Sequence, residues 1–177
     1  MKVLLLCGSV RAGSTNEAVL RTAQEVAPPG VDAVFFVGLG ALPHFNPDDD
    51  HDPLPAPVAE LRSGIDGADA LLVCIPEYAG DMPGAFKNLL EWTVGGVETT
   101  RKPVGWINAS TAAGGAASAH AMLRTVLTYT DCAVVDDACV NVGVPRTAIE
   151  GGIVTDPGLR SQIASVLTTL QEFVTPH

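Results

Sequence analysis

Residues 3–16 read VLLLCGSVRAGSTN and contain the turn on which the rest of the predicted fold depends. The run before Gly8 is short and continuously apolar, which is typical of a parallel strand buried on both faces. After the turn, apolar residues recur at helical spacing, and Ser14 followed three residues later by Glu17 matches a capping box. The stretch therefore predicts a strand, a glycine-containing turn and the start of a helix.

Hydroxyl, amide and guanidinium groups gather in that turn, where backbone N–H groups and the helix macrodipole favour an anion. The glycine spacing of a dinucleotide-binding turn is absent, and so is the G-K-[ST] ending of a nucleoside-triphosphate loop. A hydroxyl-rich loop without that lysine suits a terminal monophosphate, whose oxygens each accept several hydrogen bonds. From this loop alone, a phosphate site and an ordinary turn capped by Ser14 are equally good interpretations.

The composition is that of a well-buried globular protein, since 47% of the 177 residues are hydrophobic and 17% are charged. This length suits one sizeable α/β core, so we expect a single domain over residues 1–177. The formal net charge of −10, without a basic stripe, argues against a nucleic-acid partner but not against a small anion. We find no apolar run that could span a bilayer and no signal-peptide pattern, so we expect a cytoplasmic protein without a membrane partner.

The rest of the chain alternates strand-like and helix-like segments. Further strands are predicted at residues 31–37, 68–75, 102–107 and 133–140. Helices are predicted near residues 58–65, 83–92, 116–129 and from 156 onward, with Asp81 as the N-cap of the second. Five strands alternating with helices indicate a doubly wound α/β fold, in which a five-stranded parallel sheet has helices on both faces.

Ligands of such sheets bind beyond the carboxyl ends of the strands, where the strand order reverses. Polar, glycine-containing loops follow the first, third and fourth predicted strands, at residues 7–16, 76–84 and 108–115. In a sheet of order 2-1-3-4-5 these three strands are neighbours, so we expect their loops to converge on one pocket. This convergence favours the phosphate site over the ordinary capped turn.

Two other groups of residues are expected to carry no chemistry. The loop at residues 48–52, DDDHD, could hold a hard cation, but like charges in a proline-rich loop are usually solvated and mobile, and we expect no metal there. The cysteines have neither C-x-x-C spacing nor zinc-type pairing with His, so we expect reduced, buried thiols at Cys7, Cys74, Cys132 and Cys139.

Two longer motifs carry a family resemblance. Residues 8–16 read GSVRAGSTN, and residues 76–92 read PEYAGDMPGAFKNLLEW. Together they resemble the NADPH-dependent FMN reductase family, whose patterns are roughly G-S-x-R-x-x-S-x-N and P-E-Y-N followed by P-G-x-L-K-N-x-x-D-W. The segment 102–123 is also similar to the family, so the resemblance extends to about residue 140. It implies the flavodoxin-like fold.

The resemblance also implies an FMN site, without a metal and without a catalytic acid or base. The residues implied to bind the FMN phosphate are Ser9, Arg11, Ser14, Thr15 and Asn16. Those implied to line the isoalloxazine ring are Pro76, Glu77, Tyr78, Ala79 and Gly80 on one side, and Ser110, Thr111 and Gly114 on the other.

The chain departs from the family pattern at two places that matter. Ala79 stands where the family usually has Asn, which removes a side-chain amide that could order the loop or touch the flavin. The Arg that often follows the motif's Trp is absent, which leaves the choice between NADPH and NADH open, because a 2′-phosphate is usually bound by Arg. Lys87, Asn88 and Trp92 are expected to be structural or dimer-forming.

By this resemblance, the chain is expected to be an FMN-dependent NAD(P)H oxidoreductase. Hydride would pass from NADPH or NADH to bound FMN, and electrons then to an acceptor such as a flavin, a quinone, an azo dye or a metal oxyanion. The alternative is an electron-carrier or regulatory flavoprotein reduced by a partner protein, whose docking an acidic surface would suit.

The family usually forms oligomers, so a homodimer or homotetramer is expected. Phe86, Leu90 and Trp92 are candidates for coverage at its interface, unless they belong to the core of the chain itself.

Overall fold

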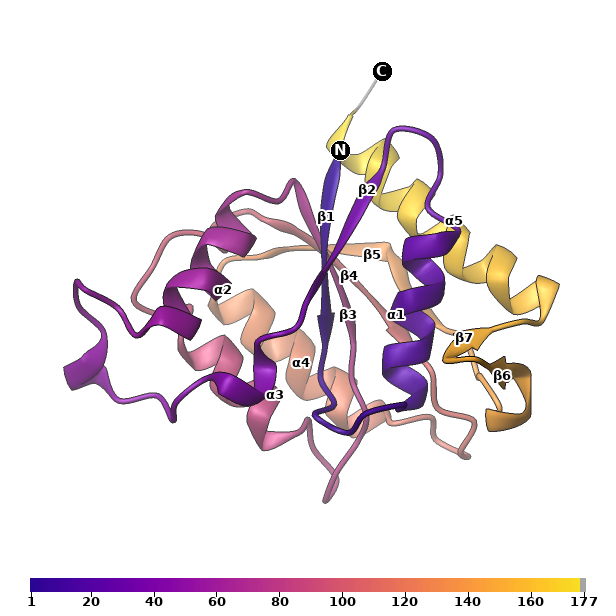
Figure 1. The fold of residues 1–177 in the computed structure, drawn as a ribbon, viewed down its shortest axis with the longest axis horizontal. Helices are drawn as coiled ribbons and strands as arrows, with labels where there is room; N and C mark the ends of the chain where they lie inside the picture. Colours follow the sequence, from indigo (N-terminus) through magenta and orange to yellow (C-terminus); the bar gives the residue numbers. More distant parts are fainter. Residues whose placement is uncertain (176–177) are drawn as a thin grey trace.

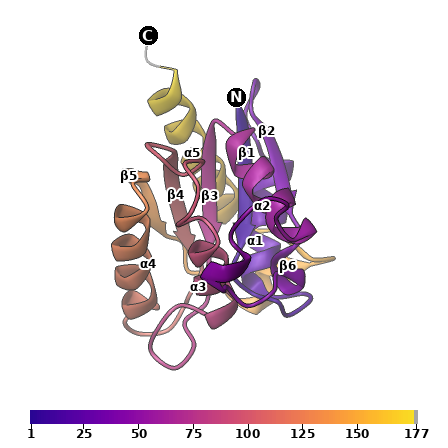
Figure 2. The same ribbon diagram turned by 90° about the vertical axis from the view of Figure 1, so that its left-hand side faces the viewer.

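The computed structural model describes residues 1–175, and a five-stranded parallel sheet forms its centre. Its order is β2-β1-β3-β4-β5, as predicted, and Figure 2 shows the strands side by side in this order. The doubly wound, flavodoxin-like architecture is therefore confirmed. The strands are β1 (Lys2–Cys7), β2 (Asp32–Phe36), β3 (Ala70–Cys74), β4 (Pro103–Asn108) and β5 (Ala133–Asn141).

Helices cover both faces of the sheet (Figure 1). On one face lie α1 (Thr15–Glu25) and α5 (Pro157–Val174), and on the other lie α2 (Ala56–Asp66), α3 (Gly84–Glu91) and α4 (Ala117–Tyr129). Strand β1 is continuously apolar because alternate side chains enter different cores: Leu5 packs with the α1 and α5 side, and Leu6 with the α2 to α4 side.

The predicted helix starts are mostly confirmed. The Ser14 hydroxyl accepts a hydrogen bond from the Glu17 N–H (3.1 Å), while the Glu17 carboxylate accepts one from Gly13, one residue before the N-cap (2.9 Å). The α5 helix begins after Asp156, as predicted. Asp81 as the N-cap of α3 is wrong: α3 begins only after Pro83, because Asp81 pairs with Tyr78 in a tight hairpin.

A short antiparallel hairpin after β5 was not predicted. It consists of β6 (Ile149–Glu150) and β7 (Ile153–Val154), follows the short 3-10 helix η3 (Arg146–Ala148), and turns at two glycines with positive φ. Strands of two residues are too short to show a period in the sequence. The Val154 N–H donates to the buried Thr22 hydroxyl of α1 (2.8 Å), which attaches the hairpin to the main body.

The acidic loop is only partly solvated, so that expectation was wrong for Asp50. Its carboxylate lies 2.7 Å from the Arg62 guanidinium, and both side chains are only 11% exposed. The Arg62 Nε also donates to the Trp92 carbonyl (2.8 Å), which links three segments. Asp48 and Asp52 are exposed. Within residues 1–175, no group of three or more His, Cys, Asp or Glu side chains is arranged to hold a metal ion.

The apolar residues considered for an interface belong to the core of the chain. Phe86 and Trp92 are fully buried and Leu90 is 3% exposed, so core packing already covers them. Trp92 and Asn88 act structurally: both donate to the Pro43 carbonyl (2.8 Å each), and the Asn88 side chain accepts from the Phe45 N–H. They hold the loop that follows β2 against α3.

The four thiols are free, as expected. Cys7 and Cys74 are buried and the other two are half-buried; burial raises the pKa of all four thiols, that of Cys139 to about 11. None of the helices in the described part of the chain has the length and apolar character needed to cross a membrane.

The buried ion pair gives a stability prediction. Asp50→Ala should lower the free energy of unfolding by about 3 kcal/mol, because it leaves the Arg62 guanidinium buried without a counter-charge. Asp48→Ala is the matched control in the same loop, where the side chain is exposed, and should change it by less than about 0.5 kcal/mol. Urea unfolding measures both. Equal, small effects would mean that Asp50 is as solvated as its neighbours.

Candidate functional site

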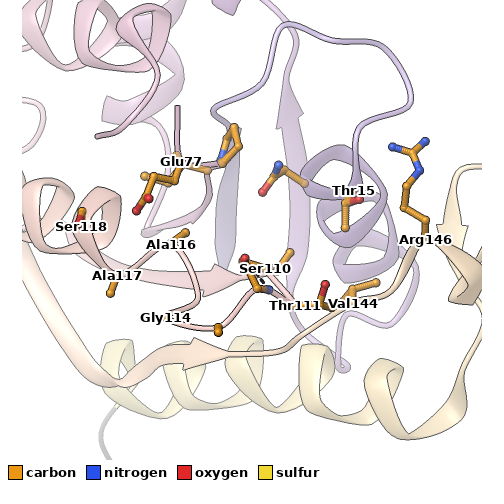
Figure 3. Close-up of a pocket in the computed structure, with 16 residues that line it drawn as sticks. Thr15, Glu77, Ser110, Thr111, Gly114, Ala116, Ala117, Ser118, Val144 and Arg146 are labelled. Carbon is orange, nitrogen blue, oxygen red and sulfur yellow. Dashed lines mark hydrogen bonds between the residues drawn. The ribbon is translucent and has the colours of Figure 1, made fainter. Parts of the chain in front are cut away.

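A cavity of about 630 Å³ opens at the carboxyl ends of the strands (Figure 3). Its volume is that of a small-molecule or cofactor site. The start of α1 and the loops after β3 and β4 all contribute to it. The predicted convergence is therefore confirmed, with Thr15 and Asn16 representing the first predicted loop, and the loop after β5 adds a fourth wall. The lining residues are Thr15, Asn16, Ile75, Pro76, Glu77, Ala109, Ser110, Thr111, Ala112, Ala113, Gly114, Ala116, Ala117, Ser118, Val144 and Arg146.

The first loop is held tightly against β3. The Gly8 N–H donates to the Cys74 carbonyl (2.9 Å), and a Cβ on Gly8 would overlap the Ile75 side chain, so only glycine fits. Beyond the loop, Thr15 and Asn16 form the first turn of α1, where backbone N–H groups have no partner within the helix. The buried Asn16 accepts a hydrogen bond from the Cys74 thiol (3.3 Å), which fixes its amide at the cavity wall.

The loop after β3 contains a tight hairpin. Tyr78 and Asp81 exchange backbone hydrogen bonds of 2.9 and 3.1 Å. Ala79 and Gly80 between them have φ values of 54° and 78°, as in a type I′ turn. That turn prefers Asn-Gly, which is a physical reason for the Asn usual in the resembling family. The hairpin projects outward, since Tyr78 is 52% exposed and does not line the cavity.

Glu77 connects this loop to α4. The helix has no side-chain cap of its own, because its N-cap is Ala116 in the left-handed conformation. The Glu77 carboxylate accepts a hydrogen bond from the Ala119 N–H (3.2 Å) and so supplies the missing cap from another loop. One carboxylate thus both lines the cavity and holds the start of α4.

His120 fastens the same helix start from the inside. Its Nδ1 donates to the Ala116 carbonyl (2.8 Å), and its buried Nε2 has no hydrogen-bond partner among the described residues. Burial lowers the pKa of His120 and so keeps the ring neutral. A neutral ring is consistent with a buried Nε2 that has no hydrogen-bond partner among the described residues.

The loop after β4 is organised by Asn108, a buried residue that the sequence analysis did not single out. Its Nδ2 donates to the Gly115 carbonyl and to Asn141 on β5 (2.9 Å to Asn141), and its Oδ1 accepts from the Ser110 N–H (3.1 Å). The signal for it was a polar residue at the end of an otherwise apolar strand. Asn108 sets the path of the loop that presents Ser110 and Thr111 to the cavity.

The predicted site residues fall into four groups. Ser14 is buried as the N-cap of α1, and the hairpin residues Tyr78, Ala79 and Gly80 are exposed at the rim. Ser9 and Arg11 line a second, smaller hollow of about 290 Å³ between the first loop and the end of β2. The residues that the structure brings together in the main cavity are Thr15, Asn16, Pro76, Glu77, Ser110, Thr111 and Gly114.

The loop after β5 was not among the predicted site segments, yet it places Val144 and Arg146 at the cavity. The end of the fifth predicted strand lies on the same edge of the sheet, so its loop was a detectable candidate. It was passed over because it carries no run of glycines and hydroxyls.

Comparisons with known proteins agree on one family. The sequence model of the NADPH-dependent FMN reductase family matches residues 1–145. An NAD(P)H-dependent FMN reductase of Pseudomonas aeruginosa is 32% identical over 177 residues, which cover 98% of this chain and 95% of that protein. A quinone reductase of Escherichia coli is 28% identical, with coverage of 98% and 95%. The solved structure of FerB, a flavoenzyme NAD(P)H:(acceptor) oxidoreductase from Paracoccus denitrificans, superposes with a TM-score of 0.83 at 27% identity and covers 97% of each chain.

The hairpin geometry predicts the effect of restoring the preferred turn residue. Ala79→Asn should stabilise the flavin-free protein by about 0.5 kcal/mol, because Asn tolerates a positive φ better than Ala does. In a thermal unfolding scan this corresponds to a rise of about 2 °C. Ala113→Asn, in an exposed loop position without a positive φ, is the control and should give no gain. No gain from Ala79→Asn would contradict the turn assignment.

Proposed function

Since this chain belongs to the NADPH-dependent FMN reductase family, we propose that it is an FMN-dependent NAD(P)H oxidoreductase that passes hydride from a nicotinamide to FMN and electrons on to an acceptor such as a quinone. The observation that carries the proposal is the cavity. It joins the start of α1, at Thr15 and Asn16, to the Pro-Glu-Tyr loop after β3 and the glycine-containing loop after β4. Together, residues 1–177 would act as a single FMN-binding domain.

The start of α1 is proposed to hold the phosphate end of FMN. Free N–H groups and hydroxyls in the first helical turn donate hydrogen bonds, and the helix dipole favours the anion there. Thr15 and Asn16 already line the cavity, and the Ser14 hydroxyl, which accepts the capping bond from the Glu17 N–H, still has its O–H to donate to the phosphate. The Ser9 hydroxyl accepts from the Arg11 N–H (3.2 Å) and so shapes the turn that precedes them, while its O–H stays available to an anion.

The flavin ring is proposed to lie between the loops after β3 and β4. Pro76 and Glu77 form one wall, and Ser110, Thr111 and Gly114 form the other. Tyr78, Ala79 and Gly80 would border the mouth, where a nicotinamide or acceptor enters. Bound FMN supplies the redox chemistry, so the chain needs no acid or base of its own. The Glu77 carboxylate already accepts a hydrogen bond from the Ala119 N–H, which supports a reaction without a catalytic acid or base from the chain.

We also propose a homo-oligomer in the cytoplasm. The free thiols suit a reducing compartment. The outer face of α4 exposes Met122 and Tyr129, and covering such apolar groups favours association between copies. Light scattering on the purified protein should therefore give a mass of two or four chains. A mass of one chain at micromolar concentration would refute the oligomer and leave the proposed reaction untouched.

Anaerobic mixing of the FMN-loaded protein with NADH and with NADPH, in separate runs, tests the reaction. Hydride transfer should bleach the visible flavin band rapidly with at least one nucleotide, and an added quinone should restore the colour. The ratio of the two rates decides the donor preference, which the absent Arg after Trp92 leaves open. Buffer with free FMN and no protein is the control.

Stable FMN binding without bleaching by either nucleotide would contradict the proposal. The chain would then be an electron carrier or a regulatory flavoprotein reduced by a partner protein.

A further inference from the structure

We propose that Arg146 binds the phosphate group of FMN from the wall of the cavity that the loop after β5 forms. The inference rests on the proposed function and adds a residue outside the segment that the family model matches, which ends at residue 145. It starts from the charges of the cavity. Of the residues that line it, all within the described part of the chain, Arg146 is the only cation and Glu77 the only anion.

Arg146 and the start of α1 line the same cavity. Figure 3 shows Arg146 on the same side of the cavity as Thr15, away from Glu77 and Ser118. The guanidinium forms none of the ion pairs found among the described residues, which involve Arg21, Arg62, Lys87, Arg124 and Arg160. Its donors are therefore available to an anion placed between the guanidinium and the helix.

The backbone that carries Arg146 is fixed from two sides. Before it, the buried Val144 donates its N–H to the Ala109 carbonyl at the end of β4 (3.1 Å). After it, the β6–β7 hairpin is attached to α1 through the Val154 N–H and the Thr22 hydroxyl. The hairpin thus helps to hold the backbone of Arg146 at the cavity, so little backbone order has to be gained when an anion binds.

The negative charge of the chain makes a cation in the cavity favourable for binding an anion. A phosphate monoester carries a charge of about −1.5 to −2 at pH 7, and the chain itself has a formal net charge of −10. Arg11, which the motif assigns to the phosphate, lines the hollow next to β2 and not the main cavity. Arg146 is placed to neutralise the phosphate inside the cavity, and its planar fork fits two phosphate oxygens at once.

Calorimetric titration of the flavin-free protein with FMN and with riboflavin tests this, because riboflavin lacks the phosphate. For Arg146→Ala, the Kd of FMN should rise by about tenfold, as expected for losing a charged hydrogen-bonding group, while the Kd of riboflavin stays unchanged. Arg146→Lys should recover part of the affinity, since it keeps the charge without the fork. Raising the salt concentration should weaken FMN binding more in the wild type than in Arg146→Ala.

Arg101→Ala is the matched control. It removes one exposed positive charge before β4, at the opposite edge of the sheet, and should leave both Kd values unchanged.

Equal losses for FMN and riboflavin in Arg146→Ala would overturn the inference, because the arginine would then act only on the shape of the cavity. An unchanged Kd for FMN with a raised KM for NADPH would also overturn it and assign Arg146 to the nucleotide. A wild-type protein that binds neither flavin would refute the proposed function itself.

Discussion

Burial of β1 on both faces is the constraint on which the rest of the molecule depends. The strand lies between β2 and β3, and its side chains enter both apolar cores. A chain leaving such a strand must turn within a few residues to cover the sheet with a helix. Gly8 makes this possible, because the turn passes so close to Ile75 that a side chain would not fit. The start of α1, and with it the proposed phosphate site, is therefore fixed by core packing.

Polar contacts between loops then complete the cavity. Three of its four walls are irregular backbone, which has no ladder of hydrogen bonds to keep its shape. Glu77 joins the β3 loop to α4, Asn108 joins the β4 loop to β5, and Thr22 joins α1 to the β6–β7 hairpin. Each of these side chains forms hydrogen bonds with backbone groups that would otherwise be unpaired. These bonds hold the loops in place around an open cavity.

Much of this was accessible before the structure. Apolar runs and helical periods predicted the five strands and the edge where ligands bind, and the family resemblance implied the strand order. The errors have local physical causes. Asp81 has the side chain of an N-cap, but its backbone pairs with Tyr78 in the hairpin, and α3 begins later. Asp50 looks solvated, but Arg62, twelve residues further on, reaches it across the surface of α2. Neither partner is visible from the local pattern, because both contacts depend on how separate segments pack.

By itself, the sequence determined the fold class, the converging loops and the family, since these depend on short-range periodicity and on motifs that are contiguous in the chain. Only the tertiary structure decided which motif residues share one cavity. Ser9 and Arg11 belong to the same motif as Thr15 and Asn16, yet they line a different hollow. Arg146, more than a hundred residues away, lies at the cavity in their place. Side chains on one loop point to opposite sides, and only the packing of distant segments determines which of them meet.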